Sequence, residues 1–274
     1  MKKIYFLIIF LLFFLPAKTQ YNVYNAALIS MGCSGVAIND FSASMNNQAA
    51  WGNLKDIHLG IGYDSKFMLK ELSNRHISFA LPLGKDRGTG GININQFGYS
   101  QFNITKAGIG YGRTLWPKFS VGFQFDAFHV ATADENYGNT TAFTIEGGFQ
   151  YKLNDKIGLG THIFNPIQTK LDRNTGEKLP SSISLGMTYK PDEALLLAAD
   201  IVKNQFQPAS VRAGFCYNIA KPFCIRSGFS TAPFTVGGGV GIIFKKLTID
   251  IATSYHQVLG FSPALTISYS FEKK

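Results

Sequence analysis

Hydrophobic and polar residues alternate with a period of two along most of the chain. From 119 to 127, every odd position holds Phe, Val or Ala, and every even position holds Ser, Gly, Gln or Asp. Successive side chains of a β-strand point to opposite faces, so this is the period that a strand with one apolar face produces. The same alternation recurs at 141–152 and at 263–272. The sequence therefore predicts an all-β protein.

Fourteen segments carry this alternation, and an even number is typical of single-chain bacterial outer-membrane barrels. Many reach the roughly 9 to 11 residues that a tilted strand needs to cross a bilayer. Tight turns such as 153–156 alternate with longer connections such as 65–74, 130–140 and 165–180, as they do in these barrels. The prediction is a 14-stranded antiparallel transmembrane β-barrel over residues 56–274. Its expected strands are 56–64, 75–84, 89–99, 103–113, 118–129, 141–152, 156–164, 181–190, 194–203, 209–218, 222–230, 233–244, 246–256 and 263–272.

A soluble β-sandwich would also alternate, but its outer face tends to be charged. Here charged residues make up 16% of the chain, below the roughly 25% of a typical soluble domain. The polar face of the segments consists mainly of Gly, Ser, Thr, Asn and Gln, and many segments end in Phe or Tyr, which suits an interface with lipid headgroups. These features favour the barrel, with outer-membrane lipid around it.

The first residues have the three parts of a secretory signal peptide. Lys2 and Lys3 give a positive start, an apolar run follows over 4–15, and small residues stand at Ala17 and Thr19. The apolar run is too short for a spanning helix, although a retained membrane anchor is the alternative interpretation. We expect a signal peptide over 1–19 and a location in the cell outer membrane.

Residues 20–55 do not alternate, and small residues with Asn and Asp favour short turns there. A barrel of fourteen strands is too wide for its wall side chains alone to fill. We therefore expect 20–55 to form a plug inside the barrel, with a disordered periplasmic tail as the alternative. The candidate plug residues are Gly32, Cys33, Asp40, Asn46, Asn47 and Trp51.

Some inward positions of the expected strands carry glycine or charge. The glycines 108, 110 and 112, and 237, 239 and 241, would let a second backbone approach the wall closely, or would relieve strand curvature. A charge facing lipid at mid-membrane costs about 2–4 kcal/mol for arginine, so charges of this kind should face the lumen. There they would pair with one another or with the plug, whereas the alternative for the two arginines is an anionic ligand. The expected luminal charges are Asp126, Glu146, Asp200, Arg212, Arg226 and Asp250.

The remaining chemistry of the sequence points away from catalysis. Cys216 and Cys224 share a face across a tight turn, which leaves open a disulfide in an oxidising periplasm or two free thiols. None of the histidines lies in a nucleophile-elbow context, and metal or phosphate-binding spacings are absent, so we expect no catalytic, cofactor or metal site. The net charge of +9 has no basic face with interleaved aromatics, which argues against nucleic acid as a partner.

Two groups of residues resemble a known family. The stretch 30–37, followed by Asn39, Asp40 and 44–50, is similar to the N-terminal motif of the FadL superfamily, specifically its PorV/PorQ-like branch. Gln48 stands where that branch commonly has proline. The segments 162–167, 208–217, 229–234 and 254–262 look like the C-terminal half of the same proteins.

This resemblance implies a fourteen-stranded barrel with an N-terminal plug and either of two roles. One is a non-enzymatic accessory subunit of a larger outer-membrane protein complex, such as a type IX secretion-type assembly. The other is a FadL-like channel that takes a hydrophobic small molecule as its ligand. Because the chain is short and its outer loops are small, we expect the subunit role and keep the channel as the alternative.

Overall fold

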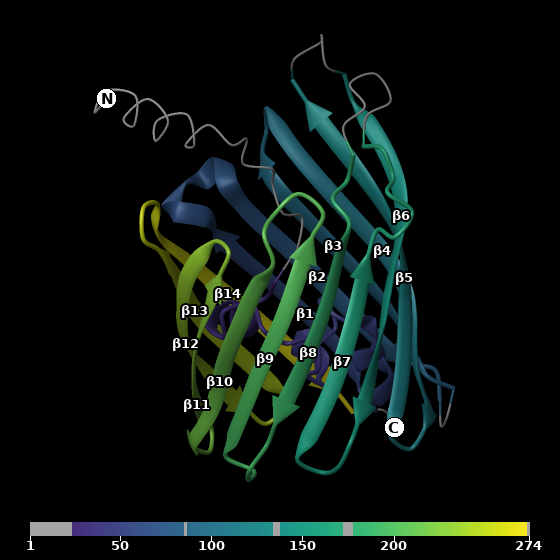
Figure 1. Ribbon diagram of the computed structural model, residues 1–274, viewed down its shortest axis with the longest axis vertical. Coiled ribbons are helices and arrows are strands. Elements are labelled where there is room, and N and C mark those ends of the chain that lie inside the picture. The colour runs from purple at the N-terminus through teal and green to yellow at the C-terminus, as the bar shows by residue number, and fades with distance from the viewer. Residues whose placement is uncertain (1–23, 85–86, 134–137, 172–177, 273–274) are drawn as a thin grey trace, which may run out of the picture.

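The chain forms a closed barrel of fourteen antiparallel strands in the computed structural model, which describes residues 24–84, 87–133, 138–171 and 178–272 (Figure 1). The expected signal peptide, 1–19, lies outside the described residues. The strands are β1 (Ile57–Ser65), β2 (Ser73–Pro82), β3 (Thr89–Tyr99), β4 (Phe102–Trp116), β5 (Phe119–Thr132), β6 (Thr140–Lys152), β7 (Ile157–Phe164), β8 (Ser182–Tyr189), β9 (Leu195–Asn204), β10 (Ser210–Ala220), β11 (Phe223–Thr231), β12 (Phe234–Phe244), β13 (Leu247–His256) and β14 (Gly260–Phe271).

Each strand pairs with its neighbours in sequence, and β1 closes the ring against β14, with Ile57 opposite Phe271. Closure leaves no strand edge, so every strand can satisfy its backbone hydrogen bonds inside hydrocarbon. The predicted barrel is confirmed, and its predicted strands differ from the observed ones by a few residues at most ends. The β14 strand begins at Gly260, ahead of the predicted start at Pro263, because Phe261 already pairs with Tyr255 of β13.

The two faces of the wall have the expected character. On β5, Phe123 and Phe125 are 49% and 58% exposed on the outside, whereas Gln124 and Asp126 are buried on the inside. Large apolar side chains are exposed in this way on strands all around the ring. Apolar residues outside and polar residues inside are the reverse of a sandwich in water, and they imply a barrel of the outer-membrane type. In the described part of the chain no helix is long and apolar enough to cross a membrane.

Residues 24–55, which we call the N-terminal segment, lie within the ring of strands, where Figure 1 draws them in purple. They form α2 (Ala26–Ser30) and two 3-10 helices, η1 (Phe41–Ala43) and η2 (Gln48–Asn53). Each begins at a side chain that accepts a backbone N–H, as Asn25 does from Leu28 and Asp40 from Ala43. Two further 3-10 turns, η3 (Lys66–Met68) and η4 (Lys70–Leu72), lie in the β1–β2 connection.

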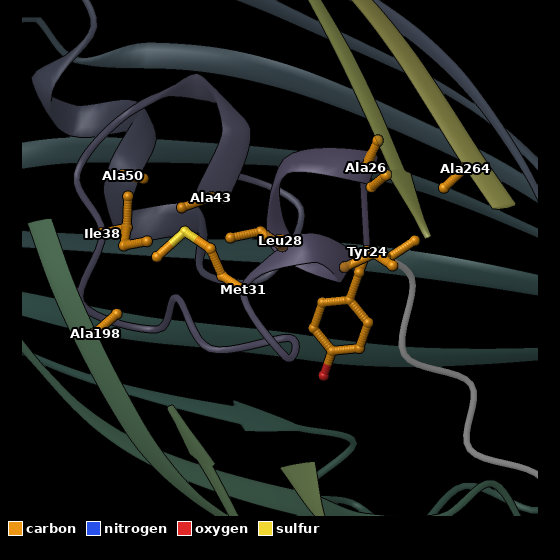
Figure 2. Close-up of a cluster of buried hydrophobic side chains, with 11 residues drawn as sticks. Tyr24, Ala26, Leu28, Met31, Ile38, Ala43, Ala50, Ala198 and Ala264 are labelled. Carbon is orange, nitrogen blue, oxygen red and sulfur yellow. The ribbon is translucent and has the colours of Figure 1, made fainter. Parts of the chain in front are cut away.

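The N-terminal segment has an apolar core of its own, which it completes against the wall (Figure 2). Leu28, Met31 and Ile38 are at most 5% exposed and pack together. Small wall residues such as Ala198 and Ala264 close this core from the barrel side. The small side chains of the wall thus leave room for the larger side chains of the N-terminal segment.

Candidate functional site

Wall glycines receive the backbone of the N-terminal segment. Gly214 on β10 and Gly228 on β11 both face the backbone of Met31, and a Cβ on either would overlap it. Gly237 on β12 faces the carbonyl oxygen of Ile29 in the same way. The missing side chains therefore let two backbones meet inside the barrel.

Four of the six glycines singled out from the sequence contact the N-terminal segment. Gly110 and Gly112 adjoin Trp51, while Gly237 and Gly239 adjoin Ile29 and Ser30. The other two, Gly108 and Gly241, instead make room for wall side chains such as Gln124 and Arg226. Strand parity places these glycines on the inner face, but it cannot tell which of them meets a second backbone.

Trp51 is fully buried at the end of the N-terminal segment. Its indole lies against Gly91 of β3 and Gly110 of β4, where a Cβ on either glycine would collide with the ring. Nearby, the backbone of Gln48 lies on Gly122 of β5. The segment therefore contacts β3–β5 on one side of the bore and β10–β12 on the other.

Side chains on the wall bind the backbone of the N-terminal segment. Asp200 Oδ2 accepts hydrogen bonds from the N–H groups of Gly35 at 2.6 Å and Val36 at 3.1 Å. The guanidinium of Arg212 donates to the hydroxyl of Tyr24 and also reaches the carbonyl of Cys33 at 3.4 Å. Both wall residues are nearly inaccessible, so these charge-assisted contacts are made out of water.

The segment's own residues add to this attachment. Asn47 Nδ2 donates to Val36 O at 2.8 Å and to Thr161 O on β7 at 3.2 Å. Gly32 packs directly on the backbone of Phe229, with a positive φ of 66° that suits glycine. Asp40 is used locally, as the cap of η1.

The sequence-derived luminal charges divide into separate groups. Arg226 and Asp250 form an ion pair at 2.5 Å. Arg212 binds the N-terminal segment rather than joining Arg226, so the structure does not bring the two arginines together as a single anion site. Cys216 and Cys224 carry free thiols, and Cys216 stands opposite Arg226 in the β10–β11 register.

Asp126 and Glu146 belong to a group that we call the luminal polar cluster, with Lys106, Gln124 and His162. Lys106 Nζ lies 2.7 Å from Glu146 Oε1 and 3.5 Å from Asp126 Oδ2. Gln124 Nε2 donates to the same two carboxylates at 2.6 and 2.7 Å. His162 Nε2 is 3.4 Å from Glu146 Oε2, and Gln48 of the N-terminal segment donates to Glu146 Oε1 at 3.0 Å.

Sequence reasoning missed Lys106, Gln124 and His162 as members of this site. Each stands at an inward position of its strand by simple parity, so the signal existed. Their grouping depends on the register between β4, β5, β6 and β7, which alternation does not give. The described residues contain no group of three or more His, Cys, Asp or Glu placed to hold a metal ion.

A second inward-facing group is apolar, and strand alternation did not predict it. This luminal apolar cluster lies nearer the end of the barrel with the longer connections, and consists of Ile104, Phe128, Ala142, Phe164, Leu171 and Leu179. The rings of Phe128 and Phe164 meet edge to face with centroids 6.0 Å apart. Lys106 Nζ lies 5.1 Å from the Phe164 ring, so the apolar and polar clusters are in direct contact.

Leu171 and Leu179 of this cluster come from the β7–β8 connection and not from the wall. Hydrogen bonds fix their backbones, from Thr140 Oγ1 to Leu171 O at 2.9 Å and from Asn165 Nδ2 to Leu179 O at 2.8 Å. Leu171 and Leu179, on either side of the part of the connection that the structure does not describe, therefore cover the apolar wall residues.

The barrel has one cavity on its inner face and a second, larger one on its outer face. A cavity of about 20 Å³ lies in the lumen beside the polar cluster, lined by Asn46, Asn93 and His162 among others. A much larger one, of about 880 Å³, runs along β8–β12 and is lined by outward-facing Met187, Phe215 and Phe229 over smaller residues. Gly214 and Gly228 border this outer hollow and also contact Met31. Little more than backbone separates the N-terminal segment from the outer surface there.

Comparison with known proteins finds similarity in structure alone. No protein-family model and no curated protein sequence matches the chain. The toluene transporter TbuX of Ralstonia pickettii superposes with a TM-score of 0.70 at 14% identity, over 92% of this chain and 99% of that one. The monoaromatic hydrocarbon channel CymD gives 0.71 at 14%, over 93% and 100%. A FadL homologue of Pseudomonas aeruginosa gives 0.59 at 12%, over 91% and 98%.

These structural neighbours are described as a toluene transporter, a monoaromatic hydrocarbon channel and a FadL homologue. They contradict the expectation of an accessory subunit in a larger outer-membrane complex, which was therefore wrong. That expectation rested on chain length and loop size. Neither property shows which ligands the lumen can bind. The alternative drawn from the same resemblance, a FadL-like channel, agrees with the neighbours.

Proposed function

We propose that this protein is a channel through which hydrophobic small molecules cross the outer membrane. Its support begins with the comparison, because solved structures that match over more than nine-tenths of both chains are described as a toluene transporter and a monoaromatic hydrocarbon channel. At 14% identity that match concerns the fold. A role in transport therefore depends on what the lumen of this chain can accommodate.

The luminal apolar cluster is the observation that carries the proposal. A barrel lumen that conducted only water and ions would have no use for Ile104, Phe128 and Phe164 on its inner face, where they add nothing to contact with lipid. Leu171 and Leu179 pack on these side chains in the same buried cluster. A hydrophobic ligand that took the place of the two leucines would bury the same wall surface, worth about 25 cal/mol for each Å² of apolar area.

The N-terminal segment acts as the plug in this proposal, and the chain divides into a signal peptide, 1–19, a plug, 20–55, and a barrel, 56–274. The plug spans the bore and is fixed by hydrogen bonds to Asp200, Arg212 and Thr161. Passage of a ligand requires part of it to move. The similarity of residues 30–50 to the PorV/PorQ-like branch is retained as a proposal about ancestry within the FadL superfamily.

Uptake of radiolabelled toluene tests the proposal in bacteria that lack hydrophobic outer-membrane channels of their own. Cells that produce the protein should accumulate toluene several-fold faster than cells with an empty vector, with no gain in glucose uptake. Ile104→Asn should lower the toluene rate because it makes the luminal apolar cluster polar. Ile219→Asn, at an exposed position beside a tight turn, is the matched control and should leave the rate unchanged.

The folded state of each variant is checked by the shift in gel mobility that unheated barrels give. Toluene uptake equal to that of the empty vector, from correctly folded wild-type protein, would refute the channel proposal. An equal increase for toluene and glucose would point to an unselective pore.

A further inference from the structure

The small luminal cavity contains buried polar atoms that have no hydrogen-bond partner in the described part of the chain. They are Asn46 Nδ2 from the N-terminal segment and Asn93 Oδ1 from β3. His162 of β7 lines the same cavity, and its Nε2 lies 3.4 Å from Glu146 Oε2. All three side chains belong to residues at most 9% exposed. Buried polar groups are normally paired, so the two asparagine amides can hydrogen-bond a polar group of a ligand that enters the cavity. At about 20 Å³ the cavity has room for a group the size of one water molecule.

The types of atom around the cavity define that occupant. Asn46 offers an amide N–H that can only donate, and Asn93 offers a carbonyl oxygen that can only accept. His162 can do either, depending on its tautomer. A hydroxyl group both donates and accepts, and it has the size of water. It therefore matches the cavity, whereas a methyl group matches its size but pairs with none of these atoms.

Charge next to the cavity argues against an acid. Asp126 and Glu146 contribute two carboxylates, and both already face the single ammonium group of Lys106, at 3.5 and 2.7 Å. A carboxylate ligand would add a third negative charge without a free cation to meet it. Neutral ligands avoid this repulsion.

The cavity also adjoins apolar surface. Met45 and Phe164 line it, and Phe164 is at the same time a member of the luminal apolar cluster. A molecule whose hydrocarbon part replaced Leu171 and Leu179 would place its end group at this cavity. The two sites together thus fit an amphiphile with one polar end.

We propose that the lumen binds neutral hydroxyl-bearing hydrophobic molecules, such as alkyl or aryl alcohols, with the hydroxyl between Asn46, Asn93 and His162. This inference rests on the proposed channel function and narrows its substrate class. It assigns Asn93 and Asn46 to specificity: they favour an alcohol over the hydrocarbon of the same shape, and the neighbouring carboxylates disfavour the acid.

Three probes that share one ring test this assignment: toluene, benzyl alcohol and benzoate. The full-length protein is placed in lipid nanodiscs, and binding of each probe is measured by isothermal titration calorimetry with empty nanodiscs subtracted. Benzyl alcohol should bind at least about tenfold more tightly than toluene, because only the alcohol satisfies the buried atoms. Benzoate should bind more weakly than either.

Variants then locate the preference. Asn93→Leu should reduce the affinity for benzyl alcohol about tenfold and leave that for toluene unchanged or raised. Asn46→Ala, in the N-terminal segment, should act in the same direction without altering a wall strand. Asn218→Leu, at an exposed position on β10, is the matched control and should change neither affinity.

The outcomes separate this inference from the channel proposal. If toluene and benzyl alcohol bind equally well, or benzoate binds most tightly, the hydroxyl site is refuted while a hydrophobic channel stands. If the Asn93 and Asn46 variants keep the alcohol preference, the assignment of those residues is also refuted. If none of the three probes binds to correctly folded protein, the channel proposal itself fails.

Discussion

Asp200 illustrates how one wall side chain holds the N-terminal segment. Its Oδ2 receives two backbone N–H groups, and it reaches them because Gly186 beside it has no side chain that would occupy the same space. Hydrogen bonds to a charged group contribute about 1.5–3 kcal/mol, more than neutral ones. Asp200 therefore supplies one of the strongest of the several attachments that hold the segment to the wall.

Asp200→Asn should loosen the N-terminal segment near Gly35 while leaving the barrel closed. The amide keeps one acceptor but loses the charge, so we expect the loss of about 1–2 kcal/mol from this attachment. The rate of maleimide labelling at Cys33, in a background with Cys216 and Cys224 changed to Ser, should rise several-fold. Asp192→Asn, at an exposed turn, should leave that rate unchanged.

Much at the residue scale follows from strand parity, and some does not. Parity placed Asp200 and Glu146 on the inner face, where both are buried. It could not reveal that the partners of Asp200 are two backbone N–H groups, because these belong to a segment without periodicity. Nor could it reveal that Lys106 lies between Asp126 and Glu146, which depends on how three strands are aligned.

At the scale of elements, α2 packs closely on the wall because the wall residues that face it are glycines. Met31, at its end, lies on Gly214 and Gly228, so the helix and strands β10 and β11 are closer than ordinary residues would permit. The segment 20–55 was recognisable as different from the strands because it does not alternate. Its contacts with particular glycines were not, since glycine serves strand curvature equally well.

Gly228→Ala should displace α2 from the wall, because a Cβ there overlaps the backbone of Met31. Overpacking of this kind costs about 1–3 kcal/mol. We expect a lower midpoint of urea unfolding in lipid vesicles and a higher ion conductance in planar bilayers. Gly238→Ala is the control, since a Cβ at that position meets nothing within 4 Å. Equal effects of the two changes would contradict the close contact.

The β7–β8 connection supplies two buried side chains that the sequence analysis did not predict. Its length predicted an outer loop, and within it Leu171 and Leu179 pack against the apolar residues of the inner wall. Alternation carries no information about a connection, and two leucines separated by polar residues give no periodic signal. What decides their position is the apolar wall surface under them, which only the closed barrel brings together.

Leu179→Ala should uncover part of this surface. Because Leu179 is fully buried, the change should lower the free energy of unfolding by about 2 kcal/mol or more. Under the proposed function it should also strengthen toluene binding, as measured by the increase in unfolding temperature that toluene produces. Leu259→Ala, at an exposed position, is expected to alter neither quantity. Weaker toluene binding in Leu179→Ala would instead make that leucine part of the ligand site.

On the scale of the whole molecule, stability depends on which face meets lipid. Both the closed ring and its apolar outer face were predictable from the sequence. A period of two that repeats over many segments indicates a sheet with one apolar face and one polar face. Depth in the membrane was less accessible to sequence reasoning. The depth of a residue in the membrane can be assigned once the observed strand bounds are known, as for Phe125 near the middle of β5.

Phe125→Arg should destabilise the barrel strongly, since a charge at mid-membrane on the lipid face costs about 2–4 kcal/mol. Phe244→Arg is also on the outside but stands at the end of β12, where the cost falls to about 0–1 kcal/mol. Equilibrium unfolding by urea in lipid vesicles would measure both. Equal losses at the two positions would contradict the placement of lipid around this barrel.

The first and last parts of the described chain are joined by a hydrogen bond from Ala26 N to Thr266 Oγ1, 2.9 Å long and spanning 240 positions of sequence. An assembling chain must therefore wait for its final strand before its beginning can be fixed. Until then, the hairpins that form early do not surround the N-terminal segment. Contacts between residues so far apart in sequence also make assembly slow. The N-terminal segment is thus fixed inside the barrel late in assembly. A fragment that lacks β14 would form its hairpins but would not close around the N-terminal segment.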